Sequence, residues 1–194
     1  LERLSGGSAS FYFENSRVQK RGDQYSALDI LNLCKEEPWQ SNPHIEFIVI
    51  SVDLWSGDKC NNFIFGATYP LLMKGGYGHV FYQEAEYVIS FNLFPGCIIS
   101  NHRIKGLIFF LQLLHELAHL FGLPGDYRRK NVESVLGLHC KLADCAMSRT
   151  AVMRNVIFPN GREVYQVISP EETWEFVKER YNKTGKYFCE DCET

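Results

Sequence analysis

The sequence predicts an α+β fold in one compact unit. Three observations lead to this prediction. The length of 194 residues is that of an ordinary single domain. The first half combines one helical pattern with several apolar runs of strand length, whereas the second half holds two helical patterns around an irregular stretch. Hydrophobic residues make up 45% of the chain and charged residues 22%, so a chain of this size can bury a full core without disulfides.

The first half begins with one predicted helix and continues with predicted strands. Apolar residues recur every third position over Gln24–Glu37, and Pro38 ends this helical pattern. A turn is expected near Lys74–Gly78 and a break at Pro95-Gly96. Short apolar runs predict strands at His44–Trp55, Asn62–Tyr69, His79–Tyr82 and Ala85–Phe91.

The second half contains the two clearest helices. The pattern from Ile104 to Phe121 is helical and strongly apolar, and Gly122 stops it. Pro124–Gly137 is polar and reads as a loop, with a solvated basic face expected at Arg128-Arg129-Lys130. A last helix starts at Ser169, followed by Pro at the first helical position and Glu three residues after the cap, and runs to about Asn182.

Charge and apolar patterning narrow the expected partners. The formal net charge of −3, from 20 Lys and Arg against 23 Asp and Glu, argues against a nucleic-acid binder. The most apolar stretch, Leu107–Leu114, is too short to span a bilayer, so we expect no membrane partner. The first residues show no basic segment followed by an apolar run, and we therefore expect a cytoplasmic protein. We also expect a monomer.

The central helix carries an H-E-x-x-H motif, His115-Glu116-Leu117-Ala118-His119. Because the two histidines are four residues apart, both imidazoles can reach one ion from one face of a helix. Zinc suits two imidazoles and a third protein ligand, with a fourth position left for water. Zinc lowers the pKa of that water to about 7, and Glu116 is placed to take its proton. The expected reaction is therefore attack of water on a carbonyl group.

The residues alone leave the third ligand open. Gly122 follows the motif where metzincin-type peptidases need a sharp turn, but the usual third histidine position is Gly125, which cannot bind a metal. Asp126 and His139 are the two candidates. The alternative of two surface histidines beside a solvated glutamate is disfavoured, because the flanking residues are almost all apolar.

Further motifs near the C-terminus carry a resemblance. The segment His139–Met147 reads H-C-x4-C-x-M, and Cys189-Glu190-Asp191-Cys192 reads C-x-x-C. Together with His115–Gly122, this arrangement resembles the archaemetzincin family of zinc peptidases, over about residues 107–192. Relative to the family pattern, about residues 124–138 are an insertion, which we expect to form a surface loop because long insertions cost little additional loop entropy.

The resemblance implies a set of site residues and a fold. His139 would be the third ligand of a catalytic zinc, Glu116 the general base, and Met147 part of a tight turn beneath the metal. The implied fold is metzincin-like: a mixed twisted sheet with helices in a single domain over 1–194, with subdomains at about 11–122 and 123–194. A second, structural zinc would be held in the small irregular C-terminal subdomain by Cys140, Cys145, Cys189 and Cys192.

The cysteines also support a metal site by their own spacing. Seven is an odd number, so a fully paired intramolecular set is impossible. Two close pairs are the usual arrangement of a tetrahedral thiolate site, and in a cytosolic chain metal is favoured over two disulfides or four unrelated thiols. We expect Cys34, Cys60 and Cys97 to be buried as small hydrophobic residues.

The sequence thus predicts a zinc peptidase with two zinc ions per chain and a peptide or protein substrate. His79–Tyr82 is a candidate edge strand for pairing with an extended peptide. Two alternatives remain at this point: a non-catalytic zinc-bound interaction module, and a zinc hydrolase or amidase that acts on a non-protein substrate.

Overall fold

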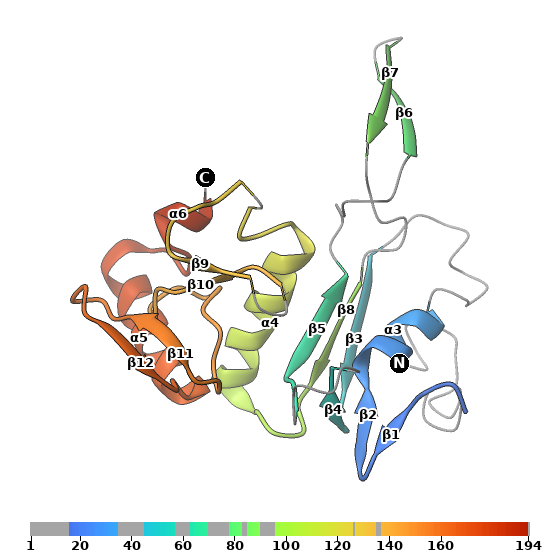
Figure 1. Ribbon diagram of the computed structural model, residues 1–194, viewed down its shortest axis with the longest axis horizontal. Coiled ribbons are helices and arrows are strands. Elements are labelled where there is room, and N and C mark those ends of the chain that lie inside the picture. Colours follow the sequence, from blue (N-terminus) through green and yellow to red (C-terminus); the bar gives the residue numbers. More distant parts are fainter. Residues whose placement is uncertain are drawn as a thin grey trace. The chain divides into compact units, whose positions relative to one another are not determined.

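The computed structural model is an α+β protein with several small sheets and helices (Figure 1). The chain divides into two compact units, residues 1–104 and 105–194. The structure describes residues 16–34, 45–56, 63–69, 78–82, 85–89, 96–125, 127–134 and 137–193.

The first unit is organised around a mixed three-stranded sheet in the order β3-β8-β5. The central strand β8 (Gly96–Ser100) is buried along its whole length. It runs parallel to β3 (Glu46–Ile50) and antiparallel to β5 (Gly66–Tyr69). The core of the unit forms where Ile48 and Ile98 lie opposite each other in the register.

Smaller elements complete the first unit. In a second sheet, β2 (Gln24–Ser26) pairs with β1 (Lys20–Arg21) on one side and with β4 (Asp53–Trp55) on the other. Helix α3 (Ala27–Cys34) packs against β5 and β8. The remaining pair, β6 (Gly78–Tyr82) and β7 (Ala85–Ile89), forms an antiparallel hairpin.

The sequence predicted the first unit only in part. The expected helix over Gln24–Glu37 begins at Ala27, because its first three residues pair as β2. The expected strand over His44–Trp55 is divided into β3 and β4 by a bend. A break was predicted at Pro95-Gly96, but strand β8 begins at Gly96 and was not predicted. The strands predicted at 79–82 and 85–91 are confirmed as the hairpin.

The second unit contains two long helices in contact, α4 (Gly106–Leu120) and α5 (Pro170–Thr184). Between them the chain forms two small antiparallel pairs, β9 with β10 and β11 with β12. The bounds of these short elements are Val132–Glu133 for β9, His139–Cys140 for β10, Arg154–Ile157 for β11, Glu163–Gln166 for β12, and Glu190–Glu193 for the terminal helix α6.

The start of α5 matches its sequence signature. The hydroxyl of Ser169 accepts a hydrogen bond from the backbone of Glu172, and the carboxylate of Glu172 accepts one from the backbone of Ser169, which makes a capping box. Gly185 ends the helix in the left-handed conformation, with φ of 71°. Among the described residues, no helix combines the length and apolar character needed to cross a bilayer.

The unit boundary differs in place from the predicted subdomain boundary. From the sequence, the helix of the H-E-x-x-H motif is expected at the end of an N-terminal subdomain, near residue 122. By its contacts, α4 belongs with the C-terminal residues, because its partners are α5 and the cysteine-rich segments of residues 105–194. All residues of the two predicted metal sites that the structure describes therefore lie in one unit.

Candidate metal centres

The end of α4 sets up the first candidate site. Gly122 has φ of 86°, a left-handed conformation that glycine adopts at little cost. Its N–H donates to the carbonyl of His119, and the N–H of Leu123 donates to the carbonyl of Ala118, both at 2.9 Å. This is the Schellman pattern of helix termination. The turn leaves the carbonyl of Leu123 facing back toward the helix, where it accepts a hydrogen bond from His119 Nδ1 at 2.8 Å.

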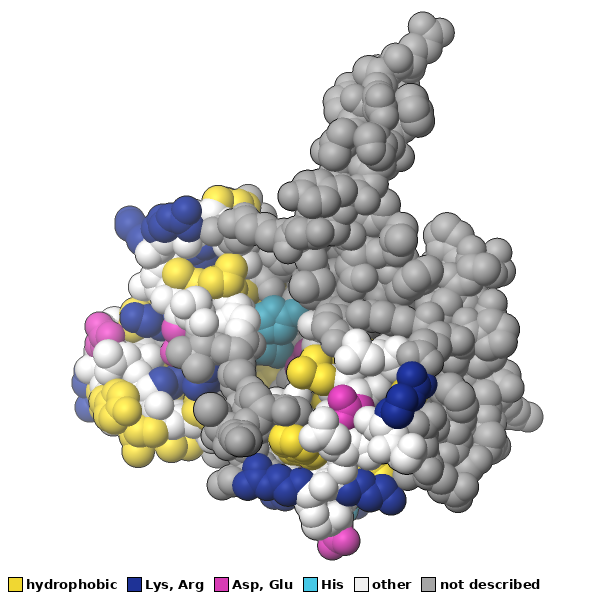
Figure 2. Space-filling model, turned by 45° about the vertical axis from the view of Figure 1, so that its right-hand side comes forward, with side chains coloured by type: hydrophobic (Ala, Val, Ile, Leu, Met, Phe, Trp, Pro, Cys, Tyr) yellow, Lys and Arg dark blue, Asp and Glu magenta, His cyan; other side chains and the backbone are white. Residues whose placement is uncertain are grey.

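Three histidines from two elements come together beside this turn. His115 and His119 lie on α4, and His139 lies on β10. The Nε2 atom of His119 is 3.1 Å from Nε2 of His115 and 3.3 Å from Nε2 of His139. His115 and His139 are buried, whereas His119 is partly exposed. Histidine side chains (cyan) reach the molecular surface in the space-filling view of Figure 2.

The backbone determines which nitrogen of each ring is free to bind. Nδ1 of His115 contacts the carbonyl of Ala146 at 2.8 Å, and Nδ1 of His139 contacts the carbonyl of Gly137 at 3.2 Å. With the His119–Leu123 contact, each of the three Nδ1 atoms therefore faces an oxygen that can only accept. The hydrogen must be on Nδ1, and the three Nε2 atoms turn lone pairs toward one another. This arrangement is the one by which backbone carbonyls orient metal-binding imidazoles.

The distances between ring nitrogens fit a bound zinc ion. Ligand nitrogens about 2.0–2.1 Å from zinc at tetrahedral angles lie about 3.3–3.4 Å apart, close to the observed separations of 3.1 and 3.3 Å. Burial, together with His115, lowers the pKa of His119 to about 3, although the bond to Leu123 acts in the opposite direction. Burial likewise lowers the pKa of His139. Both imidazoles are therefore neutral at pH 7, as metal ligands must be.

The candidate base lies on the same helix. Glu116 is buried, with 4% of its surface exposed, and its Oε1 accepts a hydrogen bond from Gln112 Nε2 at 2.7 Å. Gln112 lies one helical turn before Glu116, so it helps to fix the carboxylate. Sequence reasoning missed Gln112, although its i, i+4 spacing from Glu116 was a usable signal. Met147 is fully buried in a cluster with Ala118, the residue that precedes His119.

The other candidate for the third ligand is Asp126. Asp126 lies outside the described residues. Of the two candidates, His139 is brought within 3.3 Å of another ligand nitrogen by the described structure.

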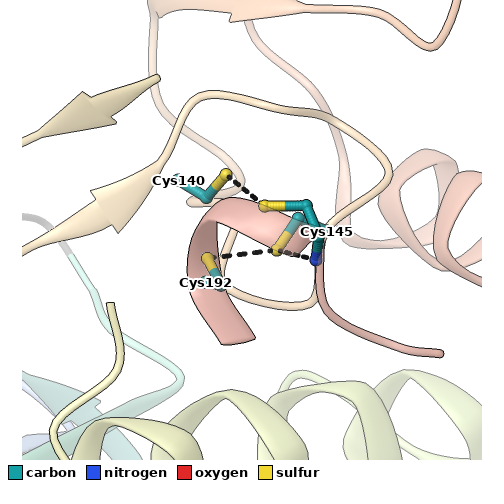
Figure 3. A group of neighbouring side chains, drawn as sticks. Cys140, Cys145 and Cys192 are labelled. Carbon is teal, nitrogen blue, oxygen red and sulfur yellow. Dashed lines mark hydrogen bonds between the residues drawn. The ribbon is translucent and has the colours of Figure 1, made fainter. Parts of the chain in front are cut away.

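Four cysteines form the second candidate site. Cys140 lies on β10, and Cys145 follows in the next turn. Cys189 directly precedes α6, and Cys192 lies within it. All four are buried, and their sulfur atoms lie within 4.8 Å of one another. Figure 3 shows the sulfurs of Cys140, Cys145 and Cys192 turned toward a common centre.

The sulfur geometry excludes disulfides in this structure and fits a tetrahedral ion. Cys140 Sγ is 3.7 Å from Cys189 Sγ, and Cys145 Sγ is 3.6 Å from Cys192 Sγ, far longer than the S–S bond of about 2.05 Å. Sulfurs about 2.3 Å from zinc at tetrahedral angles lie about 3.8 Å apart. The cysteine group, like the histidine group, could therefore hold a metal ion, and both donor sets are compatible with zinc.

The remaining cysteines agree with the expected role where they are described. Cys34 and Cys97 are buried in the first unit. Cys60 lies outside the described residues.

The prediction of a solvated basic face is wrong for Arg128. Arg129 and Lys130 are exposed, but only 6% of the surface of Arg128 is exposed, and its guanidinium points into the cysteine group. Burial by itself would lower the pKa of Arg128, but the sulfurs of Cys140, Cys192 and Cys189 together outweigh it, and the pKa is raised. The available signal was that a metal site of four thiolates carries a net negative charge, which favours a nearby cation.

Neighbouring residues on the chain serve the two sites. His139 belongs to the histidine group and Cys140 to the cysteine group, with side chains on opposite faces of β10. Ala146, whose carbonyl contacts His115, directly follows Cys145. The backbone N–H of Cys140 also donates to the carbonyl of Met147 at 2.8 Å. The cysteine group therefore anchors backbone segments that orient two of the three histidines.

We compared the chain with known families and proteins. No family model, curated protein or solved structure was found to match it.

Proposed function

We propose that this protein is a zinc-dependent peptidase that hydrolyses peptide bonds, with Glu116 as the general base. The convergence of three imidazoles on one point, each with its Nδ1 directed to a backbone carbonyl, is the observation that carries this proposal. The motif resemblance to the archaemetzincins favours the same activity. In this proposal the histidine group holds the catalytic zinc, and the cysteine group holds a structural one.

The chemistry follows from the types of side chain in the site. His115, His119 and His139 would hold the zinc ion, which would supply activation of water and polarisation of a substrate carbonyl. Glu116 accepts a proton from the attacking water and returns it to the leaving amine, the two roles of a general acid–base residue. The hydrogen bond from Gln112 holds the Glu116 carboxylate in one orientation while the proton moves. The carbonyls behind the histidines keep the three imidazoles in the metal-binding tautomer.

Substitution of Glu116 by Gln tests the proposed mechanism. The amide has nearly the same shape as the carboxylate but cannot accept the proton, so we expect turnover to fall by about 10²- to 10⁴-fold. Zinc content should stay the same, because Glu116 is not among the metal ligands. Turnover is measured on a library of quenched fluorescent peptides, and zinc by elemental analysis.

The matched control is Glu175→Gln, which makes the same chemical change on the exposed side of α5. It should leave both turnover and zinc content unchanged. A Glu116→Gln protein with full activity would refute the mechanism. If the wild-type protein holds two zinc ions and cleaves no peptide in the library, the peptidase proposal fails and a non-catalytic zinc-bound interaction module is favoured.

A further inference from the structure

The guanidinium of Arg128 contacts two sulfurs of the cysteine group. Its Nη1 donates to Cys192 Sγ at 2.6 Å, and its Nη2 lies 3.2 Å from Cys140 Sγ. The two sulfurs belong to the two different cysteine pairs of the sequence. One planar guanidinium therefore spans both halves of the group.

Backbone oxygens hold the guanidinium in this place. Nε of Arg128 donates to the carbonyl of Lys130 at 2.7 Å, and Nη2 donates to the carbonyl of Asn131 at 3.0 Å. The carboxylate of Asp191 lies 3.7 Å away and accepts a hydrogen bond from the Asn131 amide. A buried arginine so fully bonded is fixed in orientation, unlike a mobile surface charge.

Charge balance gives the reason for a cation at this position. Four thiolates around a divalent ion have a net charge of about −2, which is costly to bury without a compensating charge. Two other arginines lie near the cysteine group, and their hydrogen bonds in the described structure go to oxygen atoms. Arg180 donates to the side chain and backbone of Asp144. Arg154 donates to the hydroxyl of Ser148 and to the backbone carbonyl of Cys140. Arg128 is the cation in the described structure that bonds directly to the sulfurs.

The four sulfurs also differ in their N–H donors. Cys145 Sγ accepts from the backbone of Cys189, and Cys140 Sγ accepts from the backbone of Leu142, each at 3.4 Å. For Cys192 Sγ the described structure gives an N–H donor only in Arg128. Removing the guanidinium should therefore affect Cys192 most.

We propose that Arg128 is the counter-ion of the cysteine metal site. Its guanidinium neutralises charge on Cys140 and Cys192 and so strengthens the binding of the divalent ion. The inserted segment that carries Arg128 is then part of the metal site. The inference rests on the proposed metal in the cysteine group and is independent of peptidase activity. Arg128 acts here as a positioning residue, because it touches the ligands and not the metal.

The test measures metal affinity at the cysteine group alone. Protein is loaded with Co²⁺, and the thiolate-to-cobalt absorption in the near ultraviolet reports the cysteine site without contribution from imidazoles. Titration against a competing chelator then gives the affinity. We expect Arg128→Gln to weaken binding by about 10- to 100-fold, the usual effect of losing a residue that orients a metal ligand. Arg128→Lys keeps the charge but not the planar fork and should lie between Arg128→Gln and the wild type.

Two further variants separate charge from packing. Arg129→Gln removes a positive charge from the neighbouring exposed residue and should leave the affinity unchanged. Asp191→Asn removes the carboxylate that competes for Arg128 and should strengthen binding, by up to about fivefold for a half-exposed ion pair. A purely structural role for Arg128 predicts weaker binding in both Arg128→Gln and Asp191→Asn.

The outcomes are distinguishable. If Arg128→Gln binds Co²⁺ as tightly as the wild type, or more tightly, the counter-ion inference is overturned. If the Arg128→Gln protein does not fold, the ordering of Arg128→Lys, wild type and Asp191→Asn still decides the question. If the wild type shows no thiolate-to-cobalt absorption, the metal assignment of the cysteine group fails and the inference fails with it. None of these results measures the peptide-bond hydrolysis proposed for the histidine group, which the Glu116→Gln variant tests separately.

Discussion

His139 is the residue on which the assignment of the first site depends. It reaches the other two histidines from a different element, and it is preceded by the carbonyl of Gly137 that orients its ring. The alternative ligand suggested by the sequence is Asp126. The two ligand sets differ in the charge of the metal site, because a neutral imidazole adds no charge and a carboxylate adds one negative charge.

Metal counting separates the two possibilities. We expect His139→Ala to lose one of two zinc ions per chain, since it removes one of three converging ligands, and Asp126→Ala to keep both. Zinc is measured by elemental analysis after dialysis, with His102→Ala as a control, because His102 is an exposed histidine outside the group. Loss of one zinc only in Asp126→Ala would overturn the proposed ligand set.

Single residues also show why the sequence predicted some of the site and not all of it. The motif spacing identified His115, His119 and Glu116, because four residues make one helical turn. His139 was preferred as the third ligand through the resemblance to a family, whereas the cysteine site was also predicted from the spacing of its two pairs. Arg128 was missed because a run of three basic residues is usually solvated, and only the folded chain reveals which one turns inward.

At the level of elements, the sequence predicted the long helices better than the short strands. α4 and α5 were expected within a few residues of their observed bounds, because each spans several turns of apolar periodicity and α5 has a complete cap. β8 was missed because Pro and Gly at its start read as a break. The strands from β9 to β12 have two to four residues, too few for an alternating pattern to stand out.

The capping box of α5 can be tested by itself. Ser169→Ala removes the acceptor of one hydrogen bond at the helix start, so we expect the free energy of unfolding to fall by about 1 kcal/mol. Zinc content should not change. α5 contacts the segment between Cys140 and Cys145 through the bonds of Arg180 to Asp144, and Arg180 lies far along the helix from the cap. Denaturant unfolding measures the effect.

The control for the cap is Glu175→Ala, at an exposed interior position of the same helix. It should change stability by no more than about 0.5 kcal/mol. An equal loss of stability in both variants would mean that the cap makes no special contribution.

At the level of the whole molecule, both candidate metal groups belong to the second unit. That unit has about 90 residues, a size at which total stability is of the order of 5–15 kcal/mol. A structural zinc site contributes roughly 10–16 kcal/mol of apparent binding energy. A zinc ion bound as proposed would therefore contribute about as much free energy as the net stability of the unit, so we expect the second unit to depend on metal for its folded state.

Removal of metal tests this dependence. In a Trp39→Phe, Trp55→Phe protein, Trp174 is the remaining tryptophan and reports on the second unit, where it packs edge-on against Phe110. We expect an excess of strong chelator to shift its emission to the red as the unit unfolds, and added zinc to reverse the shift. His115→Ala, which loses only the histidine-group metal, should keep the native emission. An unchanged emission in fully metal-free protein would show that the fold does not need the metal.

The adjacency of His139 and Cys140 on β10 has a consequence for how the chain avoids misfolding. Successive side chains of a strand point to opposite faces, so a slip of β10 by one residue against β9 would exchange the two donors. A thiolate would then enter the imidazole group, and an imidazole would replace one thiolate of the other group. Both ions would lose their matching set of ligands at once. With both ions bound as proposed, metal binding would therefore favour the correct register of a strand pair that has only two residues on each side.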